Sequence, residues 1–200
     1  MIVGKDFIWL HFPKCGGVST ELALRTLLKG RRDVAFDSID HRSGIWHDTI
    51  PKRQERNETF DPAGKRIFCG IRRLPHWILS LTHFEIARGE RATTREMLLQ
   101  GRVFNSQSSL HADELLAGFS LPEVNIWIRT EYLAADLATA FALPLDRVQS
   151  SLKMENAGTM DYVRELSFWF TSRELAGLYD ANPLWADLER RVYGSLIELA

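Results

Sequence analysis

Apolar residues along the chain alternate between short continuous runs and longer stretches with helical spacing. The residues from 7 to 12, Phe-Ile-Trp-Leu-His-Phe, form the first short run, which is typical of a buried strand. In the following stretch, Ser19–Lys29, leucines partly share one face, which predicts an amphipathic helix. A second strand is expected over Asp33–Ile39. The polar stretch Asp48–Lys65 then predicts a loop, or a mobile flap that faces a substrate.

The remaining sequence continues this alternation of strands and helices. Arg66–Ile71 and Val124–Ile128 are apolar runs of strand length, and a helical pattern follows each of them. The predicted helices are Pro75–Arg88, Thr93–Leu99, Tyr132–Phe141, Ser172–Tyr179 and Pro183–Leu199. The pattern indicates an α/β fold with a central, mostly parallel sheet flanked by helices, followed by a helical C-terminal part. We expect a single domain over residues 1–200, because the chain shows neither a repeat nor a domain linker.

Composition excludes several classes of protein. Hydrophobic residues make up 45% and charged residues 26% of the 200 positions, as in ordinary globular proteins, and the net charge is −1. A dedicated nucleic-acid-binding protein is usually strongly basic, so no nucleic-acid partner is expected. No segment reaches the ~20 apolar residues of a membrane span. The two cysteines, Cys15 and Cys69, do not suggest a disulfide framework, which fits a reducing compartment.

The turn after the first strand carries the strongest chemical signal. Its residues are Lys14, Cys15, Gly16, Gly17, Val18, Ser19 and Thr20. Glycines let a backbone approach an anion closely, and the N-terminus of a helix attracts an anion with free N–H groups and a positive dipole end. Lys14 adds a positive charge. It precedes the glycines, whereas the loop of NTP-hydrolysing proteins has its lysine after them, so the turn predicts a phosphate site of another kind.

This turn resembles the 5′-phosphosulfate loop of sulfotransferases that use 3′-phosphoadenosine 5′-phosphosulfate, in particular the carbohydrate-type members. Their loop usually reads His-Ile-Pro-Lys-Thr-Gly-Gly-Thr-Ser, and residues 11–19 read His-Phe-Pro-Lys-Cys-Gly-Gly-Val-Ser. Cys15 and Val18 replace two hydroxyl residues of that pattern. The resemblance implies a P-loop-type nucleotide-binding fold. It also implies that the turn residues, from Lys14 to Thr20, hold the 5′-phosphosulfate of the cofactor.

A second segment matches the part of this family that binds the 3′-phosphate. Arg72 directly follows the predicted strand Arg66–Ile71, and Ser80 comes eight residues later. An arginine binds phosphate through two parallel hydrogen bonds, and a hydroxyl adds a third. The family segment usually reads Arg-Asp-Pro with a serine eight positions after the arginine, whereas Arg73 and Leu74 stand here in place of Asp and Pro. The resemblance assigns the 3′-phosphate to Arg72 and Ser80, with Arg73 as an alternative.

The resemblance further implies the transfer of a sulfuryl group to a hydroxyl acceptor, such as a carbohydrate, a lipid or a small alcohol. We expect Lys14 to neutralise the leaving 5′-phosphate and adenosine 3′,5′-bisphosphate to be the product. An acceptor hydroxyl needs a general base. We expect this base to be His41, after the second predicted strand, with His47 as the alternative and Asp48 or Glu55 as more distant ones. No metal is expected, because His, Asp and Glu show no ligand-like spacing.

Two other functions fit the same sequence. A nucleotide-dependent phosphotransferase or kinase of this general fold would need ATP and Mg²⁺, and the order of lysine and glycines counts against it. A catalytically inactive nucleotide-binding protein is the other, because Cys15 and the segment 72–75 depart from the family pattern. A start without a leader or anchor fits a cytoplasmic, bacterial enzyme, or a truncated form of an enzyme of the Golgi lumen. The oligomeric state stays open.

Overall fold

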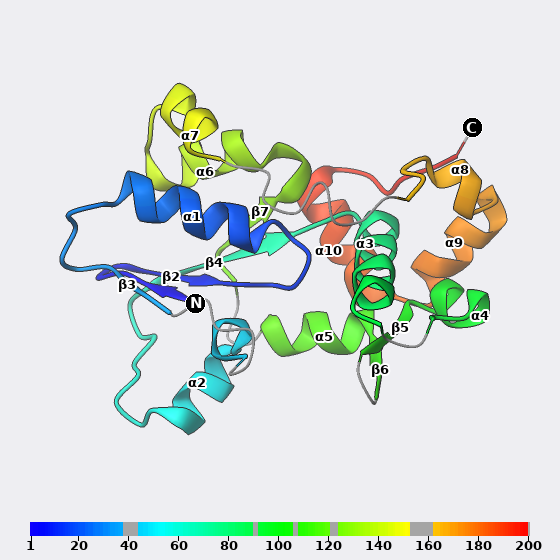
Figure 1. Ribbon diagram of the computed structural model, residues 1–200, viewed down its shortest axis with the longest axis horizontal. Helices are drawn as coiled ribbons and strands as arrows, with labels where there is room; N and C mark the ends of the chain where they lie inside the picture. Colours follow the sequence, from blue (N-terminus) through cyan, green and yellow to red (C-terminus); the bar gives the residue numbers. More distant parts are fainter. Residues whose placement is uncertain (38–43, 90–91, 106–107, 121–123, 153–161, 200) are drawn as a thin grey trace. The chain divides into compact units, whose positions relative to one another are not determined.

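The computed structural model in Figure 1 describes residues 1–37, 44–89, 92–105, 108–120, 124–152 and 162–199. The chain divides into two units that alternate along the sequence. The first unit contains Met1–Ile71 and Phe119–Glu155, and the second contains Arg72–Gly118 and Asn156–Ala200. Each unit is therefore built from two separate stretches of chain. A division of this kind does not produce a recognisable linker in the sequence. A single domain over residues 1–200 stays a prediction.

A five-stranded mixed sheet forms the framework of the first unit (Figure 1). The strands lie in the order β3-β1-β2-β4-β7, in which β2, β4 and β7 are parallel and β1 is antiparallel to both of its neighbours. Their bounds are β1 Ile2–Val3, β2 Phe7–Leu10, β3 Ala35–Phe36, β4 Arg66–Ile71 and β7 Ile126–Arg129. The predicted α/β fold with a parallel sheet centre is confirmed. Because β2 and β4 are parallel, both strands end at the same edge of the sheet.

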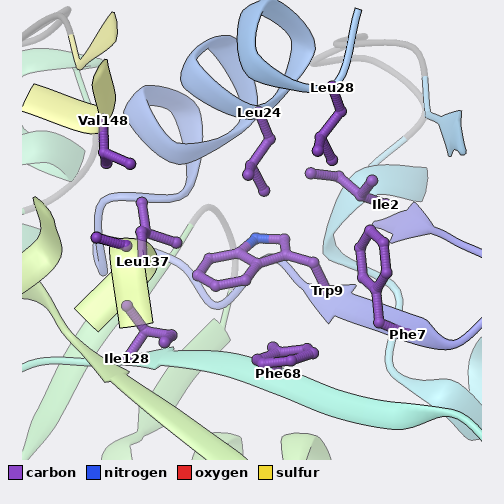
Figure 2. Packing of buried hydrophobic residues seen from close by; sticks show 10 residues of the cluster. Ile2, Phe7, Trp9, Leu24, Leu28, Phe68, Ile128, Leu137 and Val148 are labelled. Carbon is purple, nitrogen blue, oxygen red and sulfur yellow. The ribbon is translucent and has the colours of Figure 1, made fainter. Parts of the chain in front are cut away.

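The helices α1, α6 and α7 pack against one hydrophobic core of this sheet. Figure 2 shows Trp9 of β2 in the middle of this core, with Leu24 of α1 on one side and Phe68 of β4 on the other. Trp9 alternates with Ile8 along β2, and both are buried, as expected for a central strand of a covered sheet. The helices of the unit are α1 Gly17–Leu27, α2 Ile50–Arg56, α6 Leu133–Phe141 and α7 Leu145–Ser151, with short 3-10 turns η1 Ile45–His47 and η2 Thr130–Tyr132.

The second unit is mainly helical and includes one antiparallel pair of strands. Its strands are β5 Arg102–Asn105 and β6 Ser108–His111, and its helices are α3 Leu74–Ala87, α4 Arg95–Leu99, α5 Ala112–Phe119 (whose last residue belongs to the first unit), α8 Leu166–Trp169, α9 Ser172–Asp180 and α10 Pro183–Tyr193. Trp77 of α3 and Trp185 of α10 are both fully buried, and their ring centroids lie 4.6 Å apart. This pair packs α3 against α10, and it thereby helps to fix the start of α3, where Arg72 and Arg73 lie.

The predicted loop Asp48–Lys65 is wrong for its first half, where α2 forms. The side chain of Thr49 caps this helix by accepting the N–H of Lys52 at 3.4 Å, and Pro51 stands in the first turn. Thr49 and Pro51 are residues that typically begin a helix, so the start of α2 could have been predicted from the sequence. The polar composition obscured this signal, because Ile50 is the buried residue of α2 and most of its other residues are polar.

Other boundaries also differ from the prediction. The second strand is limited to Ala35–Phe36 within the described residues, and the predicted part at 38–39 lies outside them. The last helix ends at Tyr193 rather than Leu199, because Gly194 takes the left-handed conformation, with φ 83°, that commonly ends a helix. Helices over 112–119 and 145–151 were not predicted.

Candidate anion-binding site

The predicted phosphate turn lies in the first unit, between β2 and α1. The strand ends at Leu10 and the helix begins at Gly17, so residues 11–16 form the turn. Lys14 and Gly16 both have a left-handed backbone, with φ of 61° and 74°. This conformation is uncommon for a lysine, and backbone strain of this kind is concentrated at ligand sites. The fold thus holds an unusual conformation at the residue that we expect to carry the charge.

Three glycines around the turn allow close packing. A Cβ at Gly17 would lie 2.1 Å from Nε2 of His11, and a Cβ at Gly70 of β4 would lie 2.8 Å from the carbonyl oxygen of Cys15. Gly16 combines its positive φ with a contact of 3.2 Å from its missing Cβ to a side chain of α6. We expected both glycines of the turn to make room for an anion. At Gly17 the imidazole of His11 takes that room, whereas Gly70 lets the turn lie directly on β4.

The N-terminus of α1 presents main-chain donors. Gly16 is the N-cap, no side chain of the described residues caps it, and the first intrahelical bond runs from the N–H of Thr20 to Gly16 O at 2.9 Å. Helix geometry leaves the N–H groups of Gly17, Val18 and Ser19 without intrahelical acceptors. The first turn also contains no acidic residue. These donors, the positive end of the helix dipole and Lys14 together suit an anion.

Three other helices contrast with α1, because a protein carboxylate occupies the N-terminus of each. Glu189 accepts the N–H of Leu74 at the start of α3, at 2.8 Å. Asp113 accepts two N–H groups at the start of α10, at 2.8 and 2.9 Å. Glu174 forms a capping box with Thr171 at the start of α9. Within the part of the chain that is described, no carboxylate takes the corresponding place at α1.

The side chains of the turn do not all face a ligand. Cys15 is buried, and its N–H donates to Phe12 O at 3.4 Å. Thr20 is also buried, and its Oγ1 has no hydrogen-bond partner among the described residues. Val18 and Ser19 are half-buried. An anion at this turn would therefore be contacted by the side chains of Lys14 and Ser19 and by main-chain N–H groups, rather than by every side chain of the predicted turn.

Cys69, the second cysteine, is buried on β4, next to Gly70. Burial raises the pKa of its thiol well above the usual value, and the nearby Cys15 adds to this effect. Its Sγ donates to Gly70 O at 3.6 Å. Neither cysteine forms a disulfide, and both are buried, so neither has the exposure of a reactive thiol.

His11, the first residue of the turn, belongs to a buried polar chain. Its Nδ1 lies 3.9 Å from Oε2 of Glu21, and Oε1 of Glu21 accepts from Nη2 of Arg25 at 2.7 Å. Burial lowers the pKa of His11 below its usual value. Burial alone would raise the pKa of Glu21, but the nearby His11 and the hydrogen bonds from Arg25 reverse this, and the pKa is lowered. His11 thus acts as a neutral packing residue, as its place at the end of a strand suggests.

We expect the free energy of unfolding to decrease as the pH falls from 7 to 5. The folded state holds the pKa of His11 below its unfolded value of about 6.5, so the unfolded state takes up more protons in this range. The contribution of His11 to stability is complete above the pKa that it has in the unfolded state, and it is lost as the pH falls toward its pKa in the folded state. Urea unfolding at pH 7, 6 and 5 measures it. His11→Gln should flatten the dependence and His111→Gln should not; an unchanged slope in His11→Gln would contradict the assignment.

The structure describes one of the two main base candidates. His41 lies outside the described residues. His47 is the last residue of η1, and its Nδ1 lies 2.8 Å from the carbonyl oxygen of His11. A carbonyl oxygen can only accept, so Nδ1 carries the hydrogen and the lone pair of the neutral ring is at Nε2. The ring also contacts those of His11 and Trp46, at centroid distances of 4.7 and 5.0 Å. The fold thus brings His47 to the first residue of the turn.

The two more distant base candidates have other surroundings. Asp48 is buried, and its carboxylate lies 3.2 Å from Nε of Arg53 and 3.4 Å from Nε of Arg56. Glu55 is an exposed residue of α2. Both guanidinium groups belong to α2, so the carboxylate of Asp48 is engaged by this helix. Asp48 therefore belongs to the framework that anchors α2.

In the second unit, the structure separates the roles of the two adjacent arginines. Nη1 of Arg73 lies 3.1 Å from Oε1 of Glu189 and 2.5 Å from the carbonyl oxygen of Ser195. The carbonyl of Arg72 accepts Nε1–H of Trp185 at 3.1 Å. By contrast, the Nε of Arg72 is buried and has no hydrogen-bond partner among the described residues. A buried donor of this kind normally has an acceptor, so Arg72 is the arginine that suits a bound anion.

Ser80, the other predicted ligand of the 3′-phosphate, lies in the second turn of α3 and is 3% exposed. Trp77, three residues earlier, is fully buried on the same side of the helix. Ser80 therefore lies on the packed face of α3, and Arg72 is the better placed of the two predicted ligands.

Comparisons of the chain with models of protein families, with curated proteins and with solved structures found no match. Among the described residues, His, Cys, Asp and Glu side chains form no group of three that could hold a metal ion. No helix in the described ranges has both the length and the hydropathy that crossing a bilayer requires. A functional proposal therefore depends on the turn and on Arg72.

Proposed function

We propose that this chain transfers a sulfuryl group from 3′-phosphoadenosine 5′-phosphosulfate to a hydroxyl acceptor, such as a carbohydrate. The observation that supports this most is the strand–turn–helix of residues 7–27, where Lys14 precedes a helix that begins without a protein cap among the described residues. Main-chain N–H groups of Gly17, Val18 and Ser19 would hold the 5′-phosphosulfate. Parallel strands β2, β4 and β7 around this turn favour a P-loop-type fold.

Arg72 is the proposed ligand of the 3′-phosphate. Its buried Nε lacks a described acceptor, while Arg73 is engaged by Glu189 and Ser195. A guanidinium with an unused N–H can bind a phosphate through charge-assisted hydrogen bonds. The 3′-phosphate is also the group that distinguishes this cofactor from ATP. A preference for the 3′-phosphorylated nucleotide would therefore distinguish a sulfotransferase from a kinase.

In the proposed reaction, the acceptor oxygen attacks sulfur in line with the bond to the 5′-phosphate. A new S–O bond forms to the acceptor, the S–O bond to the phosphate breaks, and the acceptor proton passes to a base. Lys14 neutralises the charge that develops on the leaving phosphate oxygen. The product is adenosine 3′,5′-bisphosphate. His41 is the proposed base, and His47 is the alternative that the structure describes, with Nδ1 donating to His11 O.

Calorimetry with three nucleotides tests the proposal. We expect adenosine 3′,5′-bisphosphate to bind about 10- to 100-fold more tightly than adenosine 5′-monophosphate, because charge-assisted hydrogen bonds contribute about 1.5–3 kcal/mol. ATP with Mg²⁺ should bind no better than the monophosphate. Equal affinities for the first two would overturn the proposal, and a preference for ATP with Mg²⁺ would favour a phosphotransferase. Mass spectrometry of acceptors incubated with the sulfated cofactor then separates an enzyme from an inactive binding protein.

A further inference from the structure

Three consecutive residues at the start of α3 are held by two side chains of α10. Trp185 donates its Nε1–H to the carbonyl of Arg72 at 3.1 Å. Glu189 accepts from Nη1 of Arg73 at 3.1 Å and from the N–H of Leu74 at 2.8 Å. Trp185 and Glu189 are four residues apart, so they lie one above the other on the same face of α10. Both are fully buried, which makes this face a rigid support for the segment 72–74.

Glu189 is linked to two further parts of the second unit. The hydroxyl of Tyr179 in α9 donates to its Oε1 at 2.8 Å, and the same hydroxyl accepts the N–H of Ile197 at 3.3 Å. Burial raises the pKa of Glu189, and the donors Leu74, Tyr179 and Arg73 counteract this effect. A buried carboxylate is costly unless such donors surround it. The cluster therefore has one well-defined arrangement, and displacing any of its members is unfavourable.

The cluster holds Arg73 through its side chain, whereas it holds Arg72 through its main-chain carbonyl. The guanidinium of Arg73 donates to Glu189 at 3.1 Å and to the carbonyl oxygen of Ser195 at 2.5 Å, and it lies 4.2 Å from the ring centroid of Tyr193. The carbonyl of Arg72 accepts from Trp185, whereas the buried Nε of its guanidinium has no hydrogen-bond partner among the described residues. The backbone around Arg72 is thus fixed on its C-terminal side, while its side chain is left to bind something else.

We propose that Trp185 and Glu189 are positioning residues that direct Arg72 toward the 3′-phosphate. This inference rests on the proposed function, in which Arg72 is the ligand of that phosphate. A guanidinium on a fixed backbone loses less conformational entropy on binding than one on a mobile backbone. Glu189 also occupies the N-terminus of α3, so this helix end is closed to a second anion. The two phosphates would then be recognised differently, the 5′ group by a helix N-terminus and the 3′ group by one positioned arginine.

Glu189→Gln tests the inference, with nucleotide affinities as the measurement. An amide presents an NH₂ where the carboxylate presents an acceptor, so it cannot accept from Leu74, Arg73 and Tyr179 together. We expect the affinity for adenosine 3′,5′-bisphosphate to fall about tenfold, roughly the effect of one hydrogen bond of ordinary strength. The affinity for adenosine 5′-monophosphate should stay within about twofold, because a positioning role of this kind affects only the 3′ group.

Glu174→Gln is the matched control. Glu174 also accepts an N–H at a helix N-terminus, that of Thr171 at 2.9 Å, and it also pairs with an arginine, Arg95 at 2.7 Å. It makes no contact with the segment 72–74 in the described structure. Both affinities should stay unchanged in this variant. A general effect of weakening a cap in the second unit would appear in both variants alike.

The outcomes separate the inference from the proposed function. If Arg72→Ala loses the preference for the bisphosphate while folded Glu189→Gln keeps it, the positioning role is wrong and the proposed function stands. If the wild-type protein shows no preference, both are wrong. Should Glu189→Gln fail to fold, as shown by circular dichroism, Trp185→Phe provides the same measurement, because it removes the indole N–H and retains an aromatic ring. A retained preference in that folded variant would equally overturn the positioning role.

Discussion

Replacing Gly17 with alanine is expected to destabilise the protein by about 3 kcal/mol, the upper part of the usual range for overpacking. The new Cβ would lie 2.1 Å from Nε2 of His11, a distance at which one of the two groups must move. Neither moves easily. Gly17 is the first residue of α1, and His11 is 3% exposed, with its ring centroid 4.4 Å from that of Trp46. Urea unfolding at pH 7 measures the change.

Two further variants show whether the contact with His11 is the cause. In a His11→Ala background, the imidazole is absent, and Gly17→Ala should then cost less than about 1 kcal/mol, as a double-mutant cycle would report. Gly177→Ala is the matched control, because Gly177 lies inside α9 and no atom lies within 4 Å of its added Cβ. That variant should be more stable by about 0.5–1 kcal/mol. An undiminished cost of Gly17→Ala in the His11→Ala background would contradict the explanation.

Replacing Lys14 with asparagine is expected to lower the rate of sulfuryl transfer by about 10²- to 10³-fold, as removal of a group that stabilises transition-state charge does in other enzymes. Asparagine is chosen because Lys14 has a φ of 61°, and asparagine adopts this left-handed conformation more readily than most residues. Folding should therefore be preserved while the charge is lost. The measurement is the rate of sulfated product formation under saturating cofactor, by mass spectrometry.

Lys29→Asn is the control for this variant, because Lys29 is an exposed lysine just beyond the other end of α1. It should retain the wild-type rate. A folded Lys14→Asn protein with an unchanged rate would remove Lys14 from the reaction. His41→Ala and His47→Ala, measured in the same assay, then identify the base: the variant that loses turnover but still binds adenosine 3′,5′-bisphosphate has lost the proton acceptor.

Much of the fold could be predicted because it depends on local patterns. Arg66–Ile71 was predicted with the bounds that β4 has, since a continuous apolar run between polar residues is visible within a few positions. The helix after the turn was also predicted, although its start at Gly17 lies two residues before the expected Ser19. The strand β1 was missed, because two residues, Ile2 and Val3, show no periodicity. It forms by pairing with β2 and β3.

The candidate site shows the same division between local and long-range information. The order of residues in the turn was enough to predict a strand, a turn and a helix that presents main-chain donors, because backbone conformation depends mainly on neighbouring residues. Local sequence could not reveal that His11 fills the space beside Gly17, or that Glu189 engages Arg73 from 116 residues away. Nor could it place His47 against His11, 36 residues earlier. Such contacts arise when segments distant in the sequence pack together, and the residues next to either partner do not identify the other partner.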